Sequence, residues 1–175
     1  MRKIFYSLIF FAAYIFSNSA IAQTPEDNLK KLGIQLPKTP KPVASFVHCV
    51  RVGNLLYLSG KGPVRPDGTF MTGKVGRDLT IDSGYYAARL TAIAHLGVLK
   101  DELGDLSKVK RIVKVFGMVN CTENFFDEPK VINGYSDLMV EIFGEKGKHA
   151  RSAVGMYSLP WNTAVEVETI VEVEN

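Results

Sequence analysis

The longest regular pattern in the chain is an alternation of apolar and acidic residues close to its C-terminal end. The alternating residues are Val165, Glu166, Val167, Glu168, Thr169, Ile170, Val171, Glu172 and Val173. A period of two over this length predicts a strand with one buried face and one acidic face. Residues 151–157 can run antiparallel to this strand, joined to it through Pro160. We therefore expect a hairpin that holds Arg151 and Glu166 within one small piece of sheet.

Turn and cap residues divide the rest of the ordered chain into strands and helices. Gly53-Asn54 separates two β-type runs, and Thr80 and Ser83 suit the start of a helix that ends near Gly104. The elements expected in chain order are strands at 46–52 and 55–60, a helix at 80–104, a strand at 109–119, a helix at 127–144, and strands at 151–157 and 165–173. This β-β-α-β-α-β-β order predicts an α+β fold, a mixed sheet with both helices on one face.

Apolar residues recur in both helices at the spacing of a helical turn. In the first helix the expected buried stripe is Tyr86, Leu90, Ile93, Ala94, Gly97 and Val98. In the second helix it is Val131, Tyr135, Leu138, Met139 and Ile142. The other face of the sheet then has no cover within the chain, and it combines acidic with apolar residues. Such a face is usually completed by association, so we expect a homo-oligomer with polar clefts between its subunits.

Residues 1–22 have the three parts of a secretory signal peptide. Arg2 and Lys3 precede an apolar run at residues 4–16, and residues 20–22 form a small-x-small cleavage site. The run is shorter than the roughly 20 residues that a membrane span needs, so an uncleaved anchor is the lesser alternative. We expect cleavage after Ala22 and export to the periplasm or the outside of the cell.

The exported part divides into an N-terminal arm, residues 23–43, and one domain, residues 44–175. The arm contains Pro37, Pro40 and Pro42, which rule out a helix and favour a path over the surface that allows a short helical turn around residues 27–32. Loss of the signal peptide lowers the basic residues from 21 to 19 against 18 acidic residues, a net charge of +1. A charge so close to zero gives no support for a nucleic-acid partner, and we expect no membrane partner after cleavage.

Residues capable of metal or redox chemistry are few. His48, His95 and His149 lie on different expected elements and lack the spacing of metal ligands, so we expect no metal and no cofactor. Cys49 and Cys121 would face an oxidising compartment. They form either a disulfide or two buried free thiols, because the sequence does not show whether their Cα atoms come close enough to pair.

Three motifs carry a resemblance to a known family. They are VGNLLYLSG at residues 52–60, ARSAV at residues 150–154, and Leu159-Pro160 followed by VEVE at residues 165–168. Over roughly residues 44–173 the chain resembles the Rid family, also called YjgF. The resemblance implies a chorismate-mutase-like α+β fold and a homotrimer with clefts between its subunits. In the deaminase branch of the family it also implies hydrolysis of reactive imines and enamines.

The resemblance further implies roles for individual residues. An arginine at the position of Arg151 holds the substrate carboxylate, and a glutamate at the position of Glu166 positions or activates the attacking water. A serine at the position of Ser59, followed by Gly60, lines the cleft. The other expected cleft positions are Phe46, Lys61 and Ala153, which depart from the family pattern, and Asn133, which corresponds to the asparagine of the second helix.

Both charged residues also have a purely structural interpretation. Arg151 could pair with Glu166 or Glu168 on the neighbouring strand, because an unpaired buried charge is costly. Glu166 could be one of several solvated glutamates. The motif favours the functional interpretation, since a guanidinium matches a carboxylate with two parallel hydrogen bonds and burial can raise a glutamate pKa toward neutrality.

We therefore expect a RidA-like deaminase of small imines or enamines that carry a carboxylate, of the 2-aminoacrylate type. Its products would be a keto acid and ammonia. The alternative is a non-enzymatic module that binds small carboxylates or proteins in the same clefts. Ribonuclease activity finds no support, because the chain lacks a basic stripe.

Overall fold

The computed structural model describes residues 23–174 of the chain. Its strands are β1 (Cys49–Val52), β2 (Leu55–Lys61), β3 (Val109–Asn120), β4 (Ala150–Met156) and β5 (Val165–Val173). Its helices are α1 (Pro25–Lys31), α2 (Ile81–Leu103) and α3 (Glu128–Phe143), and its short 3-10 turns are η1 (Leu106–Lys108), η2 (Gly144–Gly147) and η3 (Pro160–Asn162). The expected β-β-α-β-α-β-β order is confirmed, with α1 added in front of it. The predicted signal peptide, residues 1–22, lies outside the described residues.

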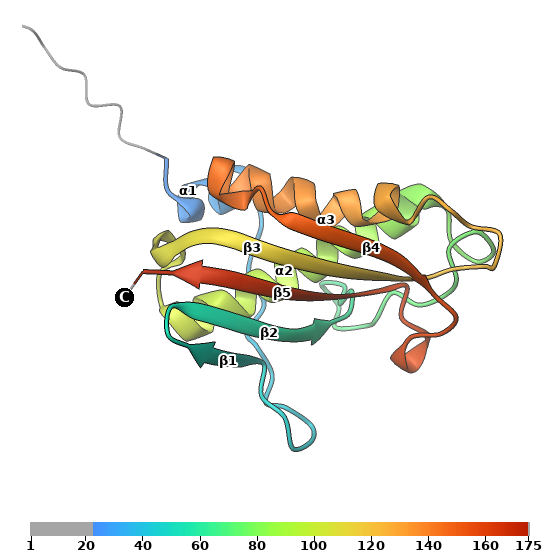
Figure 1. The fold of residues 1–175 in the computed structure, drawn as a ribbon, viewed down its shortest axis with the longest axis horizontal. Helices are drawn as coiled ribbons and strands as arrows, with labels where there is room; N and C mark the ends of the chain where they lie inside the picture. Colours follow the sequence, from blue (N-terminus) through green and yellow to red (C-terminus); the bar gives the residue numbers. More distant parts are fainter. Residues whose placement is uncertain (1–22, 175) are drawn as a thin grey trace, which may run out of the picture.

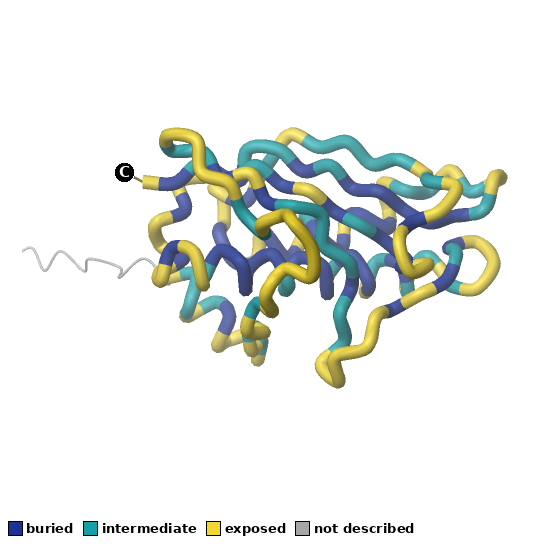
Figure 2. The backbone as a smooth tube through the Cα atoms, turned by 90° about the horizontal axis from the view of Figure 1, so that it is seen from below, coloured by how far each residue is buried: buried dark blue, intermediate teal, exposed yellow. Residues whose placement is uncertain are grey.

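The strands form one mixed sheet in the order β1-β2-β5-β3-β4. Strands β3 and β4 are parallel, and every other neighbouring pair is antiparallel. Helices α2 and α3 both lie behind the sheet in Figure 1, which confirms the two-layer α+β architecture. Figure 2 shows the same layers from below, with buried positions concentrated along the strands and helices where the layers meet.

The predicted hairpin between residues 151–157 and 165–173 is wrong. Among residues 23–174 strand β4 pairs only with β3, and β3 lies between β4 and β5. The reason is the connection through α3, because a helical crossover brings the next strand back parallel to the one that precedes the helix. The last strand then enters the sheet on the other side of β3.

Local signals set the helix ends as expected. The Thr80 side chain accepts a hydrogen bond from the Ser83 backbone N–H at the start of α2, and Gly104 ends this helix with a left-handed φ of 73°. The apolar stripe predicted for α3 is confirmed, since none of its five side chains is more than 1% exposed.

The stripe predicted for α2 is correct only in part. Tyr86 is 48% exposed, whereas His95 and Leu96, which were not assigned to it, are fully buried. Helix α2 packs against the sheet and against α3, where His95 meets Tyr135, and the N-terminal arm crosses it as well. A Cβ atom added at Gly97 would lie 2.7 Å from the Pro37 carbonyl oxygen, so the arm crosses the helix in direct contact with it.

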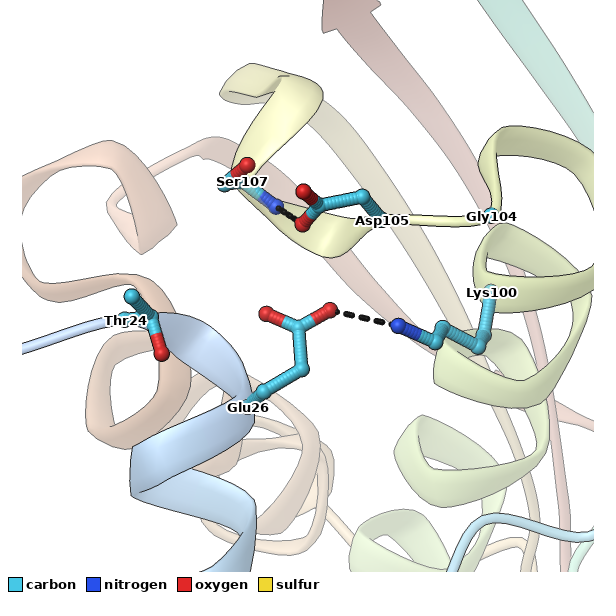
Figure 3. A pocket seen from close by; sticks show the side chains of 6 residues that line it. All are labelled: Thr24, Glu26, Lys100, Gly104, Asp105 and Ser107. Carbon is cyan, nitrogen blue, oxygen red and sulfur yellow. Dashed lines mark hydrogen bonds and ion pairs between the residues drawn. The ribbon is translucent and has the colours of Figure 1, made fainter.

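Helix α1 fastens the arm to this layer. Its Leu29 is buried, and Glu26 pairs with Lys100 of α2 at 2.8 Å (Figure 3). Glu26 also accepts a hydrogen bond from the Leu106 backbone N–H. The pocket shown in Figure 3 is lined by these anchoring groups and contains none of the residues predicted for the cleft. This pocket lies where the N-terminal arm contacts the end of α2.

The second face of the sheet carries exposed apolar residues. Val50, Val52 and Tyr57 on β1 and β2 are between 43% and 59% exposed. Within residues 23–174 no helix covers this face. It has the amphipathic character expected of a subunit interface, and the oligomer stays a prediction.

Cys49 and Cys121 are both free, so the disulfide alternative does not hold in the structure. Among residues 23–174 there is no group of three or more His, Cys, Asp or Glu side chains placed to hold a metal ion. No helix of this part of the chain is long and apolar enough to cross a membrane.

Candidate functional site

Arg151 lies on the edge strand β4 and points toward α3. Its guanidinium donates hydrogen bonds to Asn133 Oδ1 at 2.9 Å, to Ser136 Oγ at 3.0 Å and to the Pro129 carbonyl at 3.5 Å. All three acceptors are neutral, and Arg151 forms no ion pair within the described residues. The guanidinium is therefore oriented by the helix and keeps its charge available for an anion.

His149 contacts the Ser136 hydroxyl that binds Arg151. Its Nδ1 lies 2.7 Å from the Gly147 carbonyl, which can only accept, so Nδ1 carries the proton and Nε2 accepts from Ser136 Oγ at 3.0 Å. Burial lowers the pKa of His149, and the charge of Arg151 lowers it further. The imidazole therefore stays neutral and fixes the hydroxyl that holds Arg151.

Glu166 lies on β5 between the fully buried Val165 and Val167, so it points to the opposite face of the sheet. The side chain is half-buried. Burial raises the pKa of this carboxyl, and the neighbouring charge of Glu168 raises it further. Such a carboxyl is suited to exchange protons closer to neutral pH than an exposed glutamate is.

Gly60 provides the space that the Glu166 carboxylate occupies. A Cβ atom added at Gly60 would collide with Glu166 Oε1 and would lie 3.0 Å from its carboxyl carbon. The pairing register of β2 with β5 shifts between Leu58 and Lys61, which sets the backbone of Ser59-Gly60 beneath this side chain.

A Gly60→Ala variant should lose about 1 kcal/mol of unfolding free energy, because its methyl group overlaps the carboxylate and the flexible Glu166 side chain must move aside. The backbone of Gly60 is not in the left-handed region, so conformational strain does not contribute. In a Glu166→Ala background the same change should cost less than about 0.5 kcal/mol, since the colliding group is absent. Chemical denaturation of the four proteins in the cycle measures both values, and equal costs in the two backgrounds would contradict the assigned contact.

Ser59 is held by its two neighbours rather than left free for a ligand. Its hydroxyl donates to the Val47 carbonyl at 2.6 Å, and its own carbonyl lies 3.1 Å from His95 Nε2. Because a carbonyl only accepts, Nε2 carries the proton, and His95 Nδ1 accepts from Tyr135 Oη at 2.8 Å. Tyr135 Oη in turn lies 2.7 Å from Thr169 Oγ1. This buried chain joins both helices to β2 and β5 at the position of the bulge.

Lys61 is the last residue of β2, and Phe46 lies near it, since both contact His48. Lys61 Nζ donates to His48 Nδ1 at 2.7 Å, and His48 Nε2 donates to the Pro40 carbonyl at 2.7 Å. Burial lowers the pKa of Lys61. Phe46 precedes β1 instead of belonging to it and is 47% exposed, with its ring 5.8 Å edge-on from that of His48.

The predicted residues thus form two separate groups, and Glu166 of the first and Arg151 of the second lie on opposite faces of the sheet. The β2 group contains Phe46, Ser59, Gly60, Lys61 and Glu166, and the β4 group contains Arg151, Asn133 and Ala153. Ala153 packs against the core on the same face as Arg151. The prediction that Arg151 and Glu166 lie close together in one chain is wrong. The alternative prediction, an ion pair of Arg151 with Glu166 or Glu168, is wrong as well. Strand β3 separates them, and the alternation of side chains directs them apart.

Three residues that hold the predicted site residues in place were not predicted from the sequence. Ser136 lies one helical turn after Asn133, a spacing that could have indicated it. His48 and His149 carry no local signal, because their partners are backbone carbonyls and side chains distant in the sequence.

A family model described as "YjgF/chorismate_mutase-like, putative endoribonuclease" matches residues 26–173. The chain belongs to the Rid (YjgF) family. Protein TCP17 of Trypanosoma cruzi is 43% identical over 149 residues, which span 85% of this chain and 93% of that protein. A solved protein of unknown function from Agrobacterium tumefaciens is 44% identical, with a TM-score of 0.80 over 86% of this chain and 94% of its own.

Another Rid relative is named for a reaction. The 2-iminobutanoate/2-iminopropanoate deaminase of Dermatophagoides farinae is 31% identical over 142 residues, which span 81% of this chain and 95% of that protein. Family membership agrees with the chorismate-mutase-like α+β fold described above.

Proposed function

We propose that this Rid protein hydrolyses small imines that carry a carboxylate. Water adds to the imine carbon, the C–N bond breaks, and a 2-keto acid and ammonia leave. The proposal rests on two side chains. The Arg151 guanidinium is oriented by hydrogen bonds but forms no ion pair within the described residues, and the Glu166 carboxyl is partly desolvated. The name of the Dermatophagoides farinae relative supports the same reaction class.

In this proposal Arg151 binds the substrate carboxylate, and Glu166 removes a proton from the attacking water and returns it to the leaving nitrogen. The raised pKa of Glu166 suits both steps, because a catalytic acid–base group works best when its pKa lies near the working pH. Asn133 and Ser136 hold the guanidinium in place, and Gly60 leaves room for the carboxylate. None of these residues needs a cofactor for its role.

We further propose that the complete site forms between subunits of a homotrimer. Arg151 of one subunit would meet Glu166 of the next, because the two residues face opposite sides of the sheet in a single chain. The exposed apolar residues of the uncovered face support association. The signal-peptide pattern of residues 1–22 supports export as the route to its place of action.

Subunit mixing tests this shared site. Arg151→Ala and Glu166→Gln proteins, each inactive alone, should recover about a quarter of the wild-type rate when their subunits are randomised in a one-to-one mixture. The recovery arises because some interfaces then combine an intact arginine from one subunit with an intact glutamate from the other. The measurement is imine hydrolysis before and after co-refolding, with an equal mixture kept unexchanged as the control. A co-refolded mixture as inactive as its components would overturn the shared site.

A further inference from the structure

An exposed aromatic pair stands next to the Glu166 position. The rings of Phe70 and Trp161 are stacked with centroids 6.0 Å apart and an interplanar angle of 13°. Trp161 remains 74% exposed and Phe70 41% exposed. Stacking stabilises the pair, yet most of the indole surface contacts nothing else in the described chain.

The backbone that presents the indole is strained. Trp161 and Asn162 both adopt left-handed conformations, with φ values of 53° and 56°. The Thr163 N–H donates to the Pro160 carbonyl at 3.1 Å, which closes a tight turn. Asn tolerates this conformation, but a bulky residue such as Trp adopts it rarely and at a cost of about 1–3 kcal/mol. An exposed tryptophan held at such a cost indicates a use for the indole.

Two glycines connect this pair to the proposed site. A Cβ atom at Gly60 would collide with the Glu166 carboxylate, and one at Gly62 would lie 3.5 Å from the Phe70 ring and 3.3 Å from Thr163 Cγ2. Residues two apart in extended chain face the same side and are separated by about 7 Å. The Phe70 ring therefore borders the space beside the Glu166 carboxylate, and Trp161 extends that border outward.

The chemistry of this border is apolar. Arg65, the cation in the same loop, is directed toward the backbone, where it donates to the Phe70 carbonyl at 2.7 Å. Gly60 lies against the Glu166 carboxylate and Gly62 against the Phe70 ring, so the aromatic surface begins one same-side strand position from the carboxyl, where the side chain of a bound imino acid would extend. This surface would bind a hydrophobic or aromatic substituent by contact and stacking.

We propose that Phe70 and Trp161 form a specificity wall that selects imino acids with bulky apolar or aromatic side chains. This inference rests on the proposed imine hydrolysis. It places the preferred substrates among the imines derived from amino acids such as leucine and phenylalanine, ahead of the smallest imines of the alanine type.

Kinetics with imines of different size test the wall. The imines of alanine, leucine and phenylalanine are generated in place by an amino-acid oxidase, and keto-acid formation is followed for wild type and Trp161→Gly. Glycine removes the indole and also relieves the left-handed strain, so the variant should fold at least as well as wild type. Its kcat/KM should fall about tenfold for the two bulky imines and stay unchanged for the alanine imine.

Phe126→Ala is the matched control, because Phe126 is also an exposed aromatic, at 81%, on a different loop. It should leave all three rates unchanged. An equal loss for every imine in Trp161→Gly, or no loss for any, would overturn the wall. A changed oligomeric state in Trp161→Gly by light scattering would also overturn it, since the indole would then be a subunit contact.

A binding measurement separates failure of the wall from failure of the proposed reaction. Trp161 is the single tryptophan of the chain, so its fluorescence reports directly on this position. Titration with 4-methyl-2-oxopentanoate should change the emission at lower concentration than titration with pyruvate. A wild type that hydrolyses none of the imines but shows this difference would reject the reaction and keep the wall. Equal responses to both keto acids would reject the wall whatever the activity.

Discussion

A Glu166→Gln variant is expected to lose about 100- to 10,000-fold in kcat for imine hydrolysis, the usual contribution of a general acid–base group. The amide keeps the shape of the side chain but cannot take a proton from water. Stability should be unchanged or slightly higher, because burial and Glu168 both disfavour the charged carboxylate that the substitution removes. Steady-state kinetics and chemical denaturation of the same two proteins measure both effects.

The wild-type rate should also report the titration of this group. Because the pKa of Glu166 is raised above its ordinary value of 4.5, kcat/KM should increase with pH until the carboxylate form predominates, with a midpoint above 4.5. The matched control is Glu168→Gln, on the same face of the same strand but exposed. It should retain most of the activity and shift the midpoint of the profile downward, since it removes a neighbouring negative charge.

The same pair of variants distinguishes an enzyme from a binding module. An enzyme with Glu166→Gln should keep its affinity for a keto acid while losing turnover. A module that only binds carboxylates would show no turnover in the wild type and little change in the variant. Equal activity of wild type and Glu166→Gln would contradict the role assigned to this residue.

The second large effect concerns stability at acidic pH. His95 is fully buried, and burial lowers its pKa from 6.5 to about 4. The unfolded chain therefore binds a proton in this pH range that the folded chain does not. The contribution of neutral His95 to the free energy of unfolding is fully present above pH 6.5 and decreases as the pH falls toward 4. The shift corresponds to a loss on the order of 3 kcal/mol of unfolding free energy across this window.

The physical reason is the hydrogen-bond chain that contains this imidazole. A proton on Nδ1 would remove the acceptor of the Tyr135 hydroxyl and place a charge in the core. His95→Gln has no titrating group here and is the control, so the difference in unfolding free energy between wild type and variant should narrow as the pH falls from 6.5 to 4. Denaturation curves at several pH values measure it. Parallel pH dependences of the two proteins would show that His95 does not titrate in this way.

Local signals were sufficient for the elements of the fold. The alternation at residues 165–173 and the capping of α2 by Thr80 and Gly104 depend on residues within one turn or one strand of each other. The α3 stripe was correct for the same reason, because that helix buries a single face. In α2 the same reasoning failed at Tyr86 and His95, since this helix packs against α3 as well as the sheet. His95 bonds to Tyr135 of α3 and to the Ser59 carbonyl of β2, contacts that periodicity within α2 does not show.

The sequence by itself therefore determined the element order, the helix ends, the α+β class and the identity of Arg151 and Glu166 as the candidate pair. Only the tertiary structure decided how these residues lie. The strand order β1-β2-β5-β3-β4 follows from the crossover through α3, a non-local choice that leaves no trace in the periodicity of β4 or β5. Within this sheet the alternation of side chains directs Arg151 and Glu166 to opposite faces. The bridge between Thr72 and Thr163 brings Phe70 and Trp161, far apart in sequence, into contact beside Gly62.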